Sequence, residues 1–273
     1  MELPPLSGRT MSVRRFMAPS ADLAGESVRI EGDLFRHMVK VLRLKIDTRV
    51  RLADGRGVEC AGIIREIGRD HLTVAVEERH AVAPAGGSLR ITLIQGLPKG
   101  EKMELILQKG TELGVSEVVP FQADRSVSRI PADRQNERLR RWQRIAAEAS
   151  RQAGRPDIPT VRLAQGMDEA VRDTDHDLKF LLWEEERATT LQGAINVRPR
   201  PTSIAFIVGP EGGLTTEEAE TARRAGFIPV TLGRRILRTE TAGIALLAIL
   251  QYLYGDLGEG ENPEESPGSS LTS

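Results

Sequence analysis

The sequence predicts an α/β protein in two parts, a small β-barrel-like domain followed by a larger α/β domain with a parallel sheet. The 273 residues suffice for about two domains of roughly 150 residues each. Short strand-like segments separated by turn signals occupy residues 26–80, whereas strand-like and helix-like segments alternate beyond Leu89 at the spacing of βαβ units. Several of the later strand-like segments are almost continuously apolar, as in parallel sheets that are covered on both faces.

Each domain has its own predicted elements. In the first domain the predicted strands are Ser27–Ile30, Arg49–Leu52, Cys60–Ile64 and Leu72–Val76, and the apolar spacing of residues 32–42 predicts one helix. Ala83–Gly87 predicts a linker. In the second domain the predicted strands are Leu89–Gln95, Glu117–Phe121, Leu178–Trp183, Ser203–Val208 and Ile228–Leu232, and the predicted helices are about 99–113, 135–153, 215–225 and 240–254.

The two ends of the chain are predicted to lie outside the fold. Residues 256–273 are rich in Gly, Pro, Ser and Glu and contain no Lys or Arg, which predicts a disordered acidic tail. Without the five acidic residues of this tail, the formal net charge changes from −1 to +4. Patterned sequence begins only at residues 12–16, so residues 1–11 are interpreted as an extension.

Composition excludes several classes of protein. Hydrophobic residues at 40% and charged residues at 28% exclude a disordered or collagen-like chain. No apolar run approaches the roughly 20 residues that span a bilayer and no signal peptide is recognisable, which predicts a cytoplasmic protein without a membrane partner. The single Cys60 excludes an intramolecular disulfide. No metal site is expected, because metal-ligand spacing is absent among the four histidines, His37, His71, His80 and His176.

A glycine-rich turn follows the apolar strand Ile204–Val208 and leads into a predicted helix. Open α/β sheets bind ligands at the carboxyl ends of their strands, so Gly209–Gly213 predicts a small-molecule site; the alternative is a tight turn that merely needs glycines. The turn lacks the patterns of the two familiar phosphate loops. Pro210 has no N–H group and Glu211 is anionic, so a cationic or neutral ligand is favoured over a phosphate. Thr215 or Thr216 is expected to cap the helix, with Glu217 and Glu218 in its first turn.

A second such loop follows the next predicted strand. Leu232 and Gly233 end the strand, and Arg238–Thr241 places a cation, two hydroxyls and a carboxylate before an apolar helix, which Thr239 or Thr241 is expected to cap. Taken alone, each of these residues is better explained by a solvated cap and a surface salt bridge than by catalysis. Two consecutive loops at the same edge of a sheet favour a site.

The helix Thr241–Tyr254 is apolar all round, which predicts that it is buried as a core helix or in a subunit interface. We favour a homodimer interface. Basic residues cluster in residues 36–51 and 134–155, which indicates either solvated helix faces or phosphate-binding surfaces for a folded nucleic acid. An aromatic content of 4% argues against base stacking along a single strand.

Over residues 13–255, the sequence resembles the ribosomal RNA small-subunit methyltransferase E family, within the knotted SPOUT superfamily of S-adenosylmethionine-dependent RNA methyltransferases. The matching stretches are Arg14–Phe16, His37 with Val41–Arg43, Lys99–Glu104, Gln108–Gly114, Ala147–Ala149 with Gln152, Gly154–Arg155, Gly209–Gly213, Leu232–Gly233 and Ile236–Ala242. The stretches from Gly209 onward are the most specific. Two departures lie outside them: Gly110 stands where the family usually has a small non-glycine residue, and residues 149–153 vary their stretch.

The resemblance implies a PUA-like RNA-binding β domain at residues 12–84 and a SPOUT α/β methyltransferase domain with a trefoil knot at residues 88–255. It implies a homodimer that methylates N3 of a uridine in 16S rRNA of the small ribosomal subunit, with S-adenosylmethionine as cofactor and no metal. The implied cofactor-binding residues are Leu182, Trp183, Val208, Gly209, Pro210, Glu211, Gly212, Gly213, Leu232, Gly233, Ile236, Leu237, Arg238 and Thr241. The RNA-binding candidates are Arg14, Arg15, His37, Lys40, Arg43, Lys99, Arg151 and Arg155.

The implied chemistry fits these residues. Glu211 is compatible with a cationic sulfonium ligand, and methyl transfer needs a nucleophile held in line with the methyl group. Uridine N3 must lose its proton, so we hypothesise that Arg238 stabilises the uracil anion or a neighbouring phosphate. Glu240 is expected to position Arg238 or to act as the base. Glu148, Gln152 and Arg155 are expected to line the RNA side of the pocket.

Two other functions are compatible with the same sequence. A knotted methyltransferase acting on a tRNA or on a ribose hydroxyl would differ only in the nucleoside that it modifies. A non-catalytic RNA-binding or ribosome-assembly factor would keep the fold and have no reason to bind S-adenosylmethionine. The cluster Arg238–Thr241 disfavours the second alternative, because binding alone does not obviously require it.

Overall fold

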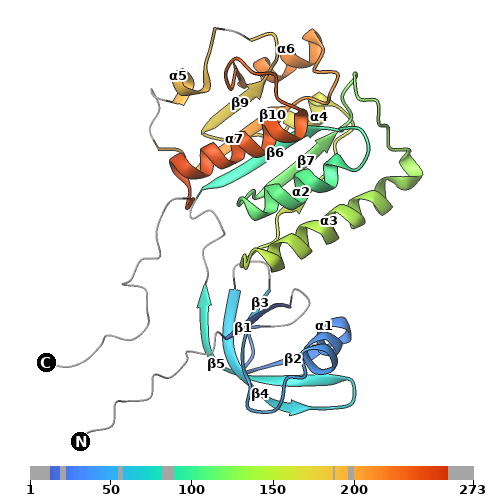
Figure 1. Ribbon diagram of the computed structural model, residues 1–273, viewed down its shortest axis with the longest axis vertical. Coiled ribbons are helices and arrows are strands. Elements are labelled where there is room, and N and C mark those ends of the chain that lie inside the picture. Colours follow the sequence, from blue (N-terminus) through green and yellow to red (C-terminus); the bar gives the residue numbers. More distant parts are fainter. Residues whose placement is uncertain are drawn as a thin grey trace, which may run out of the picture. The chain divides into compact units, whose positions relative to one another are not determined.

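The computed structural model describes residues 13–18, 23–54, 58–81, 89–186, 188–195 and 200–257 (Figure 1). The chain divides into two compact units. The first comprises the described residues up to 81 together with Gly154–Asp157, and the second comprises residues 89–153 and 158–257. Sequence patterning did not predict that Gly154–Asp157 joins the first unit. The predicted linker, the extension at residues 1–11 and most of the predicted acidic tail lie outside the described residues.

The first unit is built on a five-stranded sheet in the order β1-β3-β4-β5-β2. The strands are β1 (Arg14–Met17), β2 (Ser27–Glu31), β3 (Arg49–Ala53), β4 (Val58–Ile67) and β5 (His71–Ala81). β1 was not among the predicted strands and pairs with β3 in parallel, while the other pairs are antiparallel. Register shifts between β4 and β5, the first at Ala61/Gly62, mark bulges that bend a sheet toward a barrel. Alternate side chains such as Val28 and Ile30 are buried, so one face covers the core.

The single helix predicted for residues 32–42 is in fact two pieces. A short α-helix, α1 (Gly32–Arg36), continues into a π-helical turn, η1 (His37–Val41). The backbone N–H group of Leu42 donates to the His37 carbonyl at 2.9 Å, the wider π-type spacing. Arg43 then adopts a positive φ of 53°, a backbone conformation that non-glycine residues rarely adopt. Such turns and backbone outliers recur at functional sites.

The second unit is built on a six-stranded parallel sheet in the order β11-β9-β10-β6-β7-β8. The strands are β6 (Arg90–Gly96), β7 (Glu117–Phe121), β8 (Thr160–Val161), β9 (Leu178–Leu182), β10 (Ser203–Val208) and β11 (Ile228–Val230). The helices are α2 (Lys102–Glu112), η2 (Ala132–Arg134), α3 (Gln135–Gln152), α4 (Met167–Val171), α5 (Leu191–Ile195), α6 (Thr216–Arg224) and α7 (Thr239–Tyr254). The five predicted strands are present, whereas β8, α4 and α5 were not predicted.

Helices cover both faces of the parallel sheet (Figure 1). On one face, α2, α3, α5 and α7 enclose a core that includes Phe180 and Phe206. On the other face, α4 and α6 enclose a second core that includes Leu181 and Ile207. Neighbouring residues of each strand thus point into different cores, which explains the continuous apolar runs.

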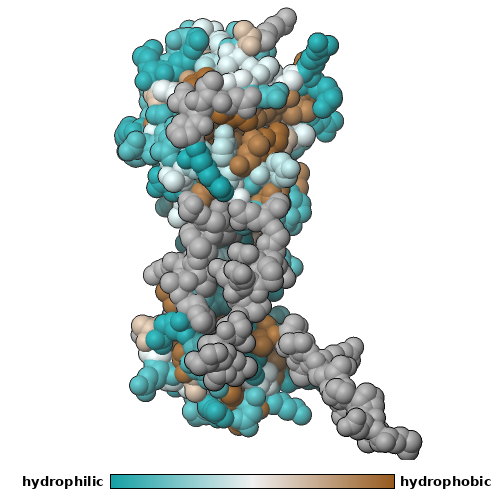
Figure 2. All heavy atoms as spheres, turned by 90° about the vertical axis from the view of Figure 1, so that its left-hand side faces the viewer, coloured by the Kyte–Doolittle hydropathy of each residue, from teal (hydrophilic) through white to brown (hydrophobic). Residues whose placement is uncertain are grey.

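After β11 at the edge of the sheet, the chain returns across the loop that ends β10 before α7 packs on β6, β10 and α2. The sequence resemblance places the trefoil knot at this return. The helix α7 is a core helix on one side only: Leu246 and Leu250 are buried, whereas Ile249, Leu253 and Tyr252 are exposed, the last to 69%. The expected burial of its remaining apolar face in a subunit interface stays a prediction. Apolar side chains reach the surface of the second unit in the face shown in Figure 2. None of the described helices is long and apolar enough to cross a membrane.

Candidate functional site

Three loops meet at the carboxyl edge of the parallel sheet. They follow β9 at Trp183, β10 at Gly209 and β11 at Thr231. The last residues of the three strands are in register, because Leu182 pairs with both Val208 and Val230. All the predicted cofactor-binding residues therefore lie in or beside adjacent loops at one edge, the arrangement in which open α/β sheets bind ligands.

The glycine loop after β10 is held in a tight turn. The N–H group of Gly213 donates to the Pro210 carbonyl at 2.9 Å, and Gly213 has a φ of +71°, which favours glycine. The helix α6 that follows carries a complete capping box. Thr215 Oγ1 accepts from the Glu218 N–H group at 3.2 Å, and the Glu218 carboxylate accepts from the Thr215 N–H group at 2.9 Å. The prediction that Thr215 caps this helix is confirmed.

The second loop connects β11 to α7 and presents an apolar side chain to the surface. Gly233 has a φ of +116°, and Ile236 is 99% exposed. Arg238 is exposed and is the residue at which α7 is capped, without a side-chain hydrogen bond. The prediction that Thr239 or Thr241 caps α7 is wrong, because both residues already lie inside the first helical turn.

The hydroxyl of Thr239 instead joins the two loops. It donates to the Gly209 carbonyl at 2.6 Å and accepts from Gln95 Nε2, at the end of β6, at 2.9 Å. Gln95 was not predicted as a site residue. Its signal in the sequence is a polar residue at the end of an otherwise apolar strand.

A lysine connects the same two loops by charge. Lys102, the first residue of α2, lies 2.7 Å from the Glu211 carboxylate and 3.4 Å from the Glu240 carboxylate. The Glu211 carboxylate also accepts from the Lys99 N–H group at 3.1 Å. Burial acts to raise the pKa of Glu211, but the hydrogen bond from Lys102 and those from backbone N–H groups hold it below its ordinary value. Lys102 balances the charge of Glu211. The preference of this loop for a cationic ligand stays a prediction.

The predicted RNA-binding residues fall into two groups. Arg14, Lys40, Arg43, Lys99 and Arg151 are exposed, and His37 is half-buried. Arg15 and Arg155 differ from this expectation, because their guanidinium groups contact other residues of the chain. The Arg15 guanidinium donates to the Glu59 carboxylate at 2.7 Å and to the Gly154 carbonyl at 2.7 Å, and Arg155 is 3% exposed and pairs with Asp157 at 2.7 Å. Both guanidinium groups make contacts within the first unit, Arg15 through its Nε and Nη1 atoms and Arg155 through its pair with Asp157.

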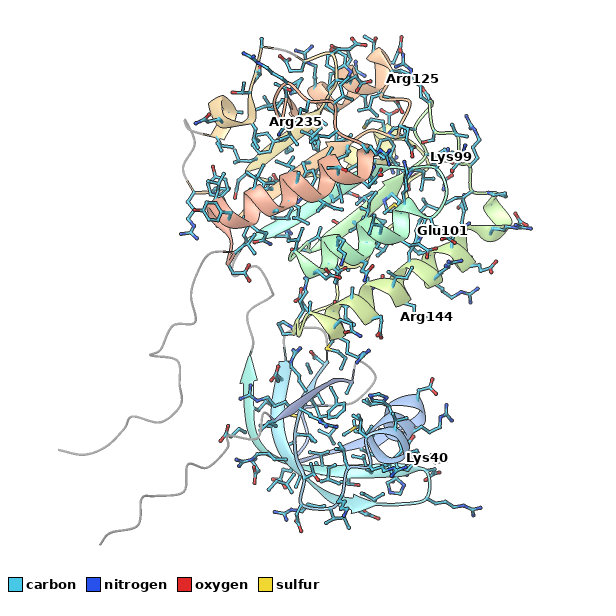
Figure 3. The ribbon with its side chains drawn as sticks, in the orientation of Figure 1. Lys40, Lys99, Glu101, Arg125, Arg144 and Arg235 are labelled. Carbon is cyan, nitrogen blue, oxygen red and sulfur yellow. The ribbon has the colours of Figure 1, made fainter. Side chains whose placement is uncertain are left out.

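Glu148 and Gln152 do not lie with the strand-end loops. They line a groove of about 500 Å³ between α2 and α3, together with Glu112 and Arg144. Glu112 ends α2, and Lys102 at its other end contacts the glycine loop, a distance along the helix of about 15 Å. Figure 3 shows Lys99 and Glu101 near the start of α2 and Arg144 on α3. The expectation that Glu148 and Gln152 line the pocket is therefore wrong within one chain.

The site contains no cluster of metal ligands among the residues that the structure describes. What the loops offer is glycine backbone at Gly212, Gly213 and Gly233 beside apolar side chains, although the Gly213 N–H group already bonds the Pro210 carbonyl and the Gly233 N–H group bonds Thr231 Oγ1. Leu182, Trp183, Leu232 and Leu237 are half-buried around these glycines. Polar backbone groups beside apolar walls suit a ligand that has both a flat ring and hydrogen-bonding groups.

Comparisons with known proteins agree with this architecture. Residues 86–251 match the RNA methyltransferase domain family, and residues 30–77 match the RNA methyltransferase PUA domain family. The chain is 31% identical over 243 residues to the ribosomal RNA small subunit methyltransferase E of Bacillus subtilis, which covers 86% of this chain and 91% of that protein. It is 32% identical over 231 residues to the protein of the same name from Mycobacterium tuberculosis, which covers 82% of this chain and 86% of that protein.

Two similar solved structures contain the cofactor. A ribosomal RNA small subunit methyltransferase E from Neisseria gonorrhoeae bound to S-adenosyl methionine has a TM-score of 0.76 at 35% identity, covering 89% of this chain and 99% of that chain. A methyltransferase from Legionella pneumophila in complex with bound SAM has a TM-score of 0.76 at 31% identity, covering 90% of this chain and 99% of that chain. These similarities confirm the predicted fold class, a PUA-like domain followed by an α/β domain of SPOUT type.

Proposed function

Because the chain belongs to the ribosomal RNA small subunit methyltransferase E family, we propose that it transfers a methyl group from S-adenosylmethionine to N3 of one uridine in 16S rRNA. The observation that carries the proposal is the junction of the three strand-end loops, where Thr239 joins the glycine loop to Arg238. The same junction supports assigning the cofactor to these loops and the catalytic role to Arg238, because Arg238 directly precedes Thr239.

The loops are suited to S-adenosylmethionine. The glycine backbone at Gly212, Gly213 and Gly233 lets the loops approach the cofactor closely, and its carbonyl groups offer acceptors to the adenosine and amino acid parts. The exposed Ile236 and the half-buried Trp183 supply apolar surface for the adenine ring. The bound cofactor supplies an electrophilic methyl group on a sulfonium, a reaction that needs no metal.

Arg238 and Glu240 are assigned different roles. As N3 of uridine gives up its proton, negative charge develops on the uracil ring, and the exposed guanidinium of Arg238 stabilises that charge. Glu240 is 9% exposed and lies 3.4 Å from Lys102 Nζ. Its burial favours a positioning role, in which it holds Lys102 and, through Lys102, Glu211 of the glycine loop.

The first unit is proposed to bind RNA through its helical turn. Lys40 and Arg43 are exposed there, and Arg43 is held in a rare backbone conformation. Lys99 offers a further exposed cation at the site. Phosphate contacts of this kind weaken steeply with ionic strength.

A homodimer is proposed on the exposed apolar residues of α7. Ile249, Tyr252 and Leu253 are exposed on a helix that is otherwise packed on the sheet. Burying them against a second copy would remove apolar surface from water. Since the proposed substrate is the small ribosomal subunit, we place the protein in the cytoplasm.

The proposal is tested by incubating the protein with labelled S-adenosylmethionine and small ribosomal subunits that lack the modification, followed by mass spectrometry of the digested rRNA. N3-methyluridine at one position is the expected product. Methylation of a ribose, or of tRNA instead, would contradict the assigned target. Absence of cofactor binding would favour the alternative of a non-catalytic RNA-binding factor. Arg238→Ala should abolish transfer at saturating cofactor while cofactor binding persists.

A further inference from the structure

Gln95 lies at the centre of the loop junction. It is the penultimate residue of β6 and is 0% exposed. Its Nε2 atom donates to Thr239 Oγ1 at 2.9 Å and to the Gly96 carbonyl at 3.0 Å. The Thr239 hydroxyl donates onward to the Gly209 carbonyl at 2.6 Å. One chain of hydrogen bonds thus joins β6, the first residue of α7 and the first residue of the glycine loop.

The direction of these hydrogen bonds is fixed by chemistry. Carbonyl oxygens only accept, so the two amide protons of Gln95 must point toward Thr239 and Gly96. The Gly209 carbonyl takes the single proton of the Thr239 hydroxyl, so Thr239 Oγ1 can only accept from Gln95 Nε2. The Val208 and Gly209 carbonyls lie 3.4 and 3.5 Å from Nε2, so rotating the amide by 180° would set its oxygen against a ring of acceptors.

Gln95 does not serve packing alone. Its Oε1 atom has no hydrogen-bond partner among the described residues, and a Cβ added at Gly243 of α7 would lie 3.5 Å from it. An unsatisfied buried acceptor is unfavourable, and the neighbouring strand residues Leu93 and Ile94 are apolar and buried. A leucine would therefore suit the core better than a glutamine. The function of the amide donors explains why a glutamine occupies this position.

We propose that Gln95 is a positioning residue for the cofactor, an inference that rests on the proposed function. Its amide orders the Thr239 hydroxyl, and that hydroxyl holds Gly209. Since Arg238 precedes Thr239 directly, the same hydrogen bonds fix the point from which the Arg238 side chain starts. Without them, the glycine loop and the start of α7 move independently, and S-adenosylmethionine binding weakens.

The chain offers a matched control at the other end of α7. Gln251 is 1% exposed, its Nε2 donates to the Gly114 carbonyl at 3.1 Å, and its Oε1 has no partner among the described residues. It lies twelve residues from Thr239 along the helix, about 18 Å, and its amide donates to one carbonyl, whereas that of Gln95 donates to both Thr239 and Gly96. Gln251→Leu and Gln95→Leu thus remove the same kind of buried amide, one far from the loops and one within them.

The test is calorimetric titration of S-adenosylmethionine into the wild type and both variants, with thermal unfolding and steady-state kinetics. Gln95→Leu should raise the dissociation constant and the KM for the cofactor at least tenfold and leave the KM for the ribosomal subunit within twofold. Gln251→Leu should stay within twofold for all three. Equal effects of the two variants, or no effect of Gln95→Leu, would overturn the inference. A wild type that fails to bind would refute the proposed function itself and with it this inference.

A second pair of variants decides the matter if Gln95→Leu does not fold. Thr239→Val removes the hydroxyl at nearly constant volume, whereas Thr239→Ser retains it. Thr239→Val should weaken cofactor binding at least tenfold, and Thr239→Ser should recover to within threefold of the wild type. Equal affinity in the two variants would overturn the inference, because Thr239→Ser keeps the hydroxyl that Thr239→Val removes.

Discussion

The end of β6 passes so close to the glycine loop that one methyl group there should disturb both stability and activity. A Cβ added at Gly96 would lie 2.6 Å from Pro210 Cδ and 2.8 Å from Pro210 N. Carbon atoms in contact rest at about 3.5–4.0 Å, so Gly96→Ala requires a displacement of about 1 Å. Since the proline ring is rigid and one of the clashing atoms is backbone, the loop itself must move.

The expected cost follows from that displacement. Overpacking of this kind costs about 1–3 kcal/mol. For a protein of this size, each kcal/mol lowers the unfolding temperature by about 2–4 °C. A misplacement of about 1 Å at a reacting centre costs on the order of 100-fold in rate, so kcat/KM for methyl transfer should fall by about that factor. Circular dichroism melting and transfer of the labelled methyl group measure the two effects.

A second glycine gives the opposite expectation for the same substitution. At Gly110, inside α2, an added Cβ would lie 3.5 Å from Val115 and 3.9 Å from Leu247, which is ordinary contact. Replacing a helical glycine by alanine stabilises by about 0.5–1 kcal/mol. Gly110→Ala should therefore raise the unfolding temperature and leave transfer unchanged. If Gly96→Ala melts no lower than the wild type, or if the two substitutions shift the unfolding temperature in the same direction, the packing argument fails.

Four further predictions concern other parts of the chain. Burial, and then neighbouring positive charges, lower the pKa of His176 to about 4. Because the unfolded residue binds its proton near pH 6.5, the free energy of unfolding should fall as the pH decreases from about 6.5 to about 4. His176→Gln should remove this pH dependence when unfolding is measured by urea titration. Thr215→Ala breaks the capping box of α6 and should cost about 1 kcal/mol, read as a lower unfolding temperature. The lowered pKa of Glu211 contributes stability that is present above its ordinary pKa of 4.5 and is lost as the pH falls through the lowered value; Lys102→Met should shift this acid transition to higher pH. Arg43→Ala should weaken RNA binding and reduce the dependence of log affinity on log salt by about one unit, whereas an unchanged slope would return Arg43 to a solvated surface role.

The parallel sheet could be predicted because each of its longer strands is buried on both faces. Ser203–Val208 is apolar over most of its length, and the boundaries of β10 are those expected from the sequence. β8 was missed because two residues, Thr160–Val161, carry no periodicity. The order of the strands in the sheet could not be predicted from the sequence either, because it depends on where each connecting helix returns the chain to the sheet.

The strand-end loops of the candidate site were predictable where the backbone itself imposes a pattern. Gly209–Gly213 and Leu232–Gly233 mark turns at strand ends, and both lie at the junction. Residues that contact the loops from distant parts of the sequence were missed. Lys102 meets Glu211 across more than one hundred residues of sequence, and Gln95 meets Thr239 across a longer interval still. The opposite error occurred at Arg155. It was predicted to bind RNA because it lies in a basic cluster, but it is buried and pairs with Asp157.

The segment Gly154–Asp157 bears on how this protein can be cut into parts. It belongs to the first unit although the chain on both sides of it belongs to the second, so the backbone passes from one unit to the other three times. An expression fragment that stops before residue 89 would lack the two carbonyl groups, of Gly154 and Arg155, to which Arg15 donates. A fragment that starts at residue 89 would contain Gly154–Asp157 without the rest of the first unit, on which these residues pack. A fragment of the first unit therefore needs residues 154–157 supplied as well, joined by a short linker or added as a peptide.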